Sequence, residues 1–302
     1  MNIKTRLFLI RSQLIHSKGL SPKTKKITKN IIFLIIGIII GLILSIPFIW
    51  MFWCAFQETT NDLYVIPPKV PNFFYYDNFK HFITDTPFLN QLKNTLIIVL
   101  SSMTLNIVAS ILVAYGFARF QAKGKKLLFG VLLSTMMLPW VVTMVPAYIL
   151  FARFGMIGTE GFPYLPLVLP SIGGSAYNIF LLKQFIEGIP KELDEAARID
   201  GCGSFRNLIQ ILLPNCLPII ATVVIFAFIG TWGDYVGPSI YILNTNDYTL
   251  ALGLQFLKSQ TMGAIDWPLV MAGCVVYAIP IIIVFVTCQK AYVRGAVGSA
   301  IK

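Results

Sequence analysis

Few side chains in this 302-residue chain are of a type and spacing that could perform chemistry. Its two histidines, His16 and His81, lie outside the long apolar runs, so a nucleophilic or metal site inside those runs would lack a histidine. An intramembrane aspartyl site needs two aspartates, and the sequence offers one candidate, Asp234. The five cysteines are odd in number and lack metal-ligand spacing, which favours packing roles. We therefore expect no catalytic residue and no metal site.

The composition is that of a membrane protein. Hydrophobic residues make up 56% of the chain and charged residues 12%, about half the charged fraction of soluble domains. A globular fold of this length could not cover so much apolar surface. Six uncharged, histidine-free runs approach or exceed the ~20 residues that a membrane-spanning helix needs. They are 31–54, 94–118, 127–152, 161–182, 215–233 and 267–289. The sequence therefore predicts an all-α integral membrane protein with six transmembrane helices.

The basic residues predict the orientation of these helices. The net charge is +11, and nineteen of the 24 lysines and arginines lie in the termini and in the alternate connections on the same side as the termini. Because basic loops stay on the cytoplasmic side, both termini are expected there, and no nucleic-acid partner is needed to explain the charge. The predicted organisation is a cytoplasmic basic segment over 1–30, a six-helix membrane domain over 31–289 and a cytoplasmic tail over 290–302.

One cytoplasmic connection, residues 190–214, has an unusual composition. A short helix with acidic residues in its first turn is expected to end at Gly201, a natural left-handed C-cap. A second short helix should stop at Pro214. On the first helix, Ala196 and Ala197 form a strip of small residues beside the acidic groups. We interpret the segment as a helical hairpin whose flat alanine face enters a groove on a partner protein.

The spacing within this hairpin resembles the signature of the permeases of binding-protein-dependent ABC importers. That signature reads Glu-Ala-Ala, three residues, Gly, nine residues, Ile, one residue, Leu-Pro, and this chain matches every fixed position. The resemblance is to the carbohydrate branch, close to the smaller permease subunit of maltose-type importers, and it runs over nearly the whole chain. One departure is Trp232-Gly233-Asp234, where similar proteins have Trp-Asn-Asp. The matching signature residues are Glu195, Ala196, Ala197, Gly201, Ile211, Leu213 and Pro214.

This resemblance implies a type I ABC importer permease that is a transport subunit and not an enzyme. Its expected partners are a second permease, two copies of a cytoplasmic ATPase and an extracellular solute-binding protein, in the plasma membrane of a prokaryote. The signature residues would couple the ATPase to the membrane helices. The sequence has no Gly-x-x-x-x-Gly-Lys-Ser/Thr loop. ATP and Mg²⁺ are therefore expected on the ATPase, with no cofactor bound by this chain.

The resemblance also implies a sugar or oligosaccharide as substrate. Four aromatic residues could stack on sugar rings along the path, although each could equally be a packing or interface residue. Asp234 could line or gate the path, or be a helix-end carboxylate at the interface. Glycerol phosphate or a polyol is the alternative substrate. An ion-coupled secondary transporter is a more distant alternative, because the runs show no internal repeat and few ionisable groups. The four aromatic candidates are Tyr115, Trp140, Tyr177 and Trp232.

The predicted orientation can be tested by cysteine labelling. Cysteines introduced at Lys69 and Asp247 should react with a membrane-impermeant thiol reagent on intact cells, because both lie in connections predicted to be outside. A cysteine at Lys125 should react only after the membrane is permeabilised. Labelling at Lys125 in intact cells would contradict the orientation.

Overall fold

The computed structural model describes residues 22–66, 69–158, 162–259 and 265–300, and every regular element in these ranges is helical. Most of the predicted basic segment, residues 1–21, lies outside the described residues. By its internal contacts the chain divides into two units, Met1–Trp53 and Cys54–Lys302. The helix α2 (Pro22–Ala55) accounts for the described part of the first unit, and from Ile31 onward it is apolar on nearly all sides. A helix of that character suits a lipid or protein environment on every face.

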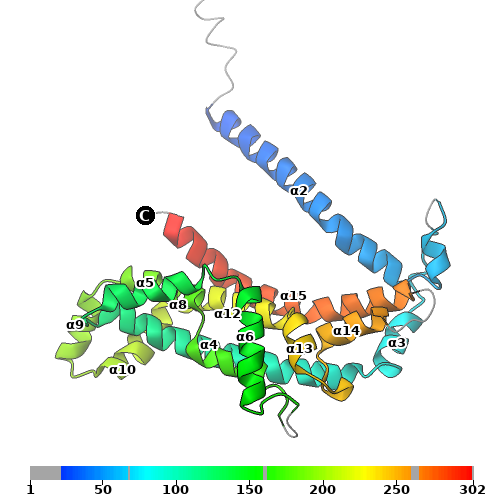
Figure 1. Ribbon diagram of the computed structural model, residues 1–302. Helices are drawn as coiled ribbons and strands as arrows, with labels where there is room; N and C mark the ends of the chain where they lie inside the picture. Colours follow the sequence, from blue (N-terminus) through cyan, green and yellow to red (C-terminus); the bar gives the residue numbers. More distant parts are fainter. Residues whose placement is uncertain (1–21, 67–68, 159–161, 260–264, 301–302) are drawn as a thin grey trace, which may run out of the picture. The chain divides into compact units, whose positions relative to one another are not determined.

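In the second unit, α4 lies at the centre of a helical bundle (Figure 1). It packs along α8 and α12, and α12 in turn packs along α15. Small and branched side chains fill the contact between α4, α8 and α12, with Ala114, Ile179, Leu182 and Val223 all buried. The bounds of these helices are α4 (Phe88–Arg119), α8 (Ala176–Glu187), α12 (Leu217–Trp232) and α15 (Trp267–Ala300).

Two of the six predicted spans are sharply bent and a third is interrupted. The third span bends by 96° between α5 and α6, where Pro139 has an extended backbone and, as a proline, disfavours a helical conformation in the residue before it. The fourth is interrupted at Gly174, whose φ of +72° with ψ of 176° is accessible essentially to glycine alone. The fifth bends by 83° at its start, at Cys216, where the helix that ends at Asn215 meets α12. The elements concerned are α5 (Lys125–Thr135), α6 (Trp140–Arg153), α7 (Leu165–Val168) and η2 (Leu169–Gly173).

The number of helices able to cross a membrane agrees with the sequence. Four described helical stretches are long and apolar enough by themselves, and there are six if each bent pair counts as one span. The predicted all-α fold with six membrane-spanning segments is thus confirmed. Bent helices also occur in secondary transporters, so the bends by themselves do not distinguish the two classes of transporter.

The expected end of the second hairpin helix at Pro214 is wrong. The chain continues as a helix from α10 through Pro214 and ends at Cys216. A proline inside a helix collides with the carbonyl four residues earlier. Here the turn before it is widened into a π-helix, with the amide of Leu213 donating to the carbonyl of Leu208. This wider turn gives Pro214 room. The elements are α10 (Ser204–Asn207), the π-helix η3 (Leu208–Leu212) and α11 (Leu213–Asn215).

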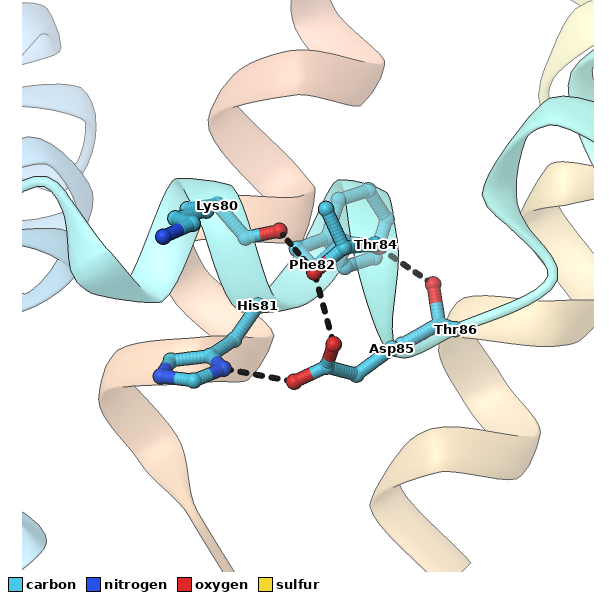
Figure 2. Close-up of polar contacts among 6 residues, drawn as sticks. All are labelled: Lys80, His81, Phe82, Thr84, Asp85 and Thr86. Carbon is cyan, nitrogen blue, oxygen red and sulfur yellow. Dashed lines mark hydrogen bonds and ion pairs between the residues drawn. The ribbon is translucent and has the colours of Figure 1, made fainter.

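The remaining elements connect the spans. The short helix α3 ends in a local polar network (Figure 2), in which the Thr84 hydroxyl shares its one hydrogen between the carbonyl of Lys80 and Asp85 Oδ1. His81 Nδ1 lies 2.5 Å from the other Asp85 oxygen. These hydrogen bonds from Thr84 and His81 lower the pKa of the Asp85 carboxyl. The connecting elements are η1 (Thr60–Leu63), α3 (Asp77–Thr84), α9 (Glu192–Ile199), α13 (Val236–Tyr241), η4 (Thr245–Asp247) and α14 (Leu250–Ser259).

Candidate functional site: a helical hairpin at the end of α4

The turn between α9 and α10 has the geometry expected from the sequence. Gly201 has a φ of +76°, in the left-handed region. The amide of Cys202 donates to the carbonyl of Ala197 at 2.8 Å, and that of Gly201 to the carbonyl of Arg198 at 3.1 Å. This pair of bonds is a Schellman motif, which satisfies the last carbonyls of α9 and reverses the chain tightly. The two helices and the turn form the hairpin predicted from residues 190–214.

An ion pair joins the hairpin to the end of α4. Arg119 Nε lies 2.7 Å from Asp194 Oδ2, and the two side chains are only 7% and 20% exposed. The Nε–H bond does not point along this line, so the contact is ionic rather than a straight hydrogen bond. Arg119 also donates through Nη2 to the carbonyl of Ile189 at 3.0 Å. The last residue of α4 is therefore tied both to α9 and to the segment that leads into it.

Two further polar contacts make this joint a small network. The side-chain amide of Asn207 in α10 donates to Asp194 Oδ1 at 2.6 Å, and this hydrogen bond connects the two hairpin helices. The hydroxyl of Tyr115 donates to the carbonyl of Ser204 at 3.0 Å, and its ring packs with Leu208 and other buried residues. Tyr115, a candidate for the substrate path from its sequence, thus lies at the hairpin.

The structure divides the signature residues between two faces of the hairpin. Glu195 and Ala196 are exposed, as are Gly201 and Pro214. Ala197 is only 5% exposed, and so faces the protein's own interior. Ile211 and Leu213 are half-buried, and Leu213 packs against the cluster that contains Tyr115. The exposed face therefore includes one of the two signature alanines, while the other helps to hold the hairpin.

Sequence reasoning missed two large apolar side chains on the hairpin. Ile199 is 87% exposed and Phe205 67% exposed, and they flank the turn at Gly201. Exposed apolar side chains grouped in this way are typical of protein-binding surfaces. The available signal was their position on either side of the glycine turn. Asp194 is among the acidic residues expected in the first turn of the first hairpin helix, but nothing in the sequence indicated that it pairs with Arg119.

Two adjoining pockets lie deeper in the second unit, between α4, η2 and α12. They have volumes of about 130 and 290 Å³ and share the lining residues Ser102, Ser171, Gly230 and Thr231. The Ser102 hydroxyl is buried and has no hydrogen-bond partner among the described residues. Together the two pockets form a polar seam between these helices, in a protein whose other interhelical contacts are mostly apolar.

Three of the five predicted path residues border this seam. Asp234 lines the smaller pocket, and its Oδ1 accepts a hydrogen bond from the amide of Gly237 at 2.9 Å. Trp232 forms a wall of the same pocket; it is 1% exposed and its Nε1 donates to the carbonyl of Tyr277. Tyr177 lines the larger pocket and is 42% exposed. Trp140, at the start of α6, is 55% exposed and lines neither pocket.

Residues 106–297 match the family described as "Binding-protein-dependent transport system inner membrane component". The chain is 30% identical over 260 residues to the probable ABC transporter permease protein YurM of Bacillus subtilis strain 168, with 86% of this chain and 84% of that protein covered. It is 31% identical over 261 residues to the galactooligosaccharides transport system permease protein GanQ of the same strain, with coverages of 85% and 89%.

The fold is also found in a solved structure. A crystal structure of a bacterial ABC transporter involved in the import of the acidic polysaccharide alginate matches with a TM-score of 0.74 at 18% identity, over 90% of this chain and 99% of that chain. The chain belongs to the family of binding-protein-dependent transport system inner membrane components, and its fold is that of a type I ABC importer permease.

The turn of the hairpin gives a direct prediction. In Gly201→Ala the new Cβ meets no atom within 4 Å, so its effect comes from the left-handed backbone alone. That strain is about 1–2 kcal/mol, which should raise hydrogen exchange of α9 and α10 amides about five- to thirtyfold. Gly203→Ala is the matched control, because Gly203 has a φ of −70° and equally open space. Equal exchange rates in the two variants would contradict the assignment.

Proposed function

We propose that this chain is a permease subunit of an ATP-driven importer and, with a second permease, forms the membrane pathway for a sugar or oligosaccharide. The observation that carries the proposal is the hairpin, which combines the complete family signature with an exposed apolar and acidic surface. Relatives such as GanQ and the maltodextrin transport system permease protein MdxG of Bacillus subtilis strain 168, 31% identical over 227 residues (75% of this chain, 80% of that protein), support a carbohydrate substrate.

The hairpin docks on a cytoplasmic ATPase subunit, one of two copies that bind ATP and Mg²⁺. Ile199 and Phe205 insert into an apolar groove, while Glu195 pairs with a basic group at its rim. Because Ala197 faces inward, it keeps the hairpin close to the membrane helices, and Ala196 offers the small surface that the groove accepts. A partly desolvated ion pair of this kind contributes far more to binding than an exposed one.

The opposite end of the protein faces the cell exterior, as the distribution of basic residues predicts. It holds α3, η4 and α14, which receive the solute-binding protein. A solved bacterial alginate ABC transporter in complex with an alginate pentasaccharide-bound periplasmic protein has the same fold, with a TM-score of 0.63 at 16% identity, over 89% of this chain and 95% of that chain. Both termini of the present chain then lie in the cytoplasm, at the plasma membrane of a prokaryote.

The polar seam forms this subunit's part of the substrate path. Tyr177 has a partly exposed ring that can stack on a sugar, whereas Trp232 acts as a wall because its ring is already packed. Asp234 and Ser102 offer hydrogen bonds to hydroxyl groups. The described residues that line the two pockets include Asp234 but no lysine, arginine or histidine. This favours a neutral sugar over glycerol phosphate, whose phosphate would be repelled by the carboxylate.

The docking surface can be tested with substitutions that leave the bundle intact. Glu195→Lys and Phe205→Asp should each weaken ATPase binding by about 2–5 kcal/mol, because they oppose the charge or the apolar character of the groove. The measurement is co-purification of the ATPase subunit with the tagged permease, together with its ATP hydrolysis.

Lys123→Glu is the control, since it reverses an exposed charge outside the hairpin. It should retain the ATPase at the parental level. Parental co-purification and hydrolysis in both hairpin variants would show that the hairpin is only a connector.

A further inference from the structure

Among the described helices, α4 is the long helix of the second unit that neither a proline nor a sharp bend interrupts. Its 32 residues correspond to a length of about 48 Å. It contains no proline and a single glycine, Gly116, in its last turn. The third and fifth spans are sharply bent, and α15 contains Pro280. Rigid secondary elements are among the structures that carry coupling between distant sites.

At the end opposite the hairpin, buried side chains of α4 hold a connecting segment by its backbone. Asn94 is 5% exposed, and its side-chain amide donates to the backbone carbonyls of Asn246 at 3.0 Å and Tyr248 at 3.1 Å. The backbone N–H of Leu250 donates to the hydroxyl of Thr95 at 2.8 Å. These bonds involve the backbone of residues 246–250, so the start of α14 follows α4 whatever its own side chains contact.

The contact with α14 is also close in space. A Cβ at Gly253 would overlap the side chain of Gln91, which is 7% exposed and so has little room to move. Figure 1 shows α9 and α10 near one end of α4, and α14 alongside the other. One helix therefore makes buried polar contacts near each of its ends. Arg119 pairs with Asp194 of the hairpin at one end, and Asn94 and Thr95 each bond to the backbone of residues 246–250 at the other.

We infer that α4 mechanically links the ATPase-binding hairpin to the segment 244–250 at the opposite end, and that Arg119 and Asp194 are the positioning residues of this link. The inference rests on the proposed function, because the ATPase drives the hairpin. When the ATPase moves α9, the buried ion pair obliges α4 to follow, and α4 moves the segment that faces the solute-binding protein. Arg119 contacts no substrate in this scheme; it acts through α4.

The test measures movement at the end of α4 that the ATPase does not touch. Thr245→Cys places a thiol in the exposed η4 segment of the purified transporter, with its partner subunits, in nanodiscs. The labelling rate of the peptide containing residue 245 with a maleimide is followed by mass spectrometry, without nucleotide and with ATP plus vanadate. We expect the rate to depend on nucleotide in this parent protein.

Asp194→Asn should reduce the difference in labelling rate between the two nucleotide conditions at least about fivefold. The ATPase subunit should still co-purify. The substituted amide oxygen can still accept the hydrogen bond from Asn207, so the hairpin remains connected and only the ion pair is lost. Asp194→Glu should restore the dependence. Glu187→Gln is the matched control: it breaks the 2.7 Å pair between Lys183 and Glu187 within α8 and leaves in place the contact of the Lys183 ammonium with the Phe129 ring of α5.

The outcomes separate this inference from the proposed function. A parent protein without a bound ATPase would contradict the proposed function, and the link with it. If the ATPase is bound and the labelling rate of the parent protein is the same with and without nucleotide, the link alone is overturned. The same holds if the Asp194→Asn variant shows the parental change in labelling rate. Loss of the ATPase in Asp194→Asn would also overturn it, since the pair would then belong to the docking surface.

Discussion

The buried ion pair between Arg119 and Asp194 is the contact on which the arrangement of the hairpin depends. Removing two charges from water is costly, and an ion pair offsets that cost only when further hydrogen bonds satisfy both partners. Here Ile189 and Asn207 provide one hydrogen bond to each partner, while Arg119 Nη1 has no hydrogen-bond partner among the described residues. Loss of one partner of such a pair costs about 3–5 kcal/mol. The joint therefore resists separation, and α9 is held at a defined place at the end of α4.

The membrane imposes the second constraint, since hydrocarbon provides no partner for a free backbone group. A break within a span is tolerated where the protein buries it or where it borders a polar cavity. The interruption of the fourth span follows this rule. Its 3₁₀ segment η2 contributes Ser171 to both polar pockets, and the amide of Ser175 donates to the hydroxyl of Ser110 in α4. The same irregular backbone that weakens the helix thus creates the polar seam proposed as the substrate path.

The sequence predicted those features that depend on local chemistry. The helical spans follow from long uncharged runs, and the left-handed turn at Gly201 follows from a glycine after an acidic, alanine-containing helix. The seven signature residues were found because they are close in the chain. The sequence put Tyr115 near the cytoplasmic end of the 94–118 run but did not reveal its contact with the hairpin, because only packing brings its hydroxyl to Ser204.

Long-range pairing explains the other differences. Asp194 suits the first turn of any helix, so its role toward Arg119, 75 positions earlier, leaves no local pattern in the sequence. Pro214 predicts a helix end, and only the widened turn over residues 208–212 allows the helix to continue. Ala197 faces inward because the hairpin lies against its own bundle. Such packing cannot be derived from one segment taken alone.

The most direct test of the account is sugar uptake into proteoliposomes. The complete transporter, reconstituted with its second permease, ATPase and solute-binding protein, should accumulate a radiolabelled oligosaccharide only when ATP is present on the ATPase side. Vesicles lacking this chain should accumulate none. If the purified chain alone moved the sugar in response to a proton gradient, it would be a secondary transporter and the account would be contradicted.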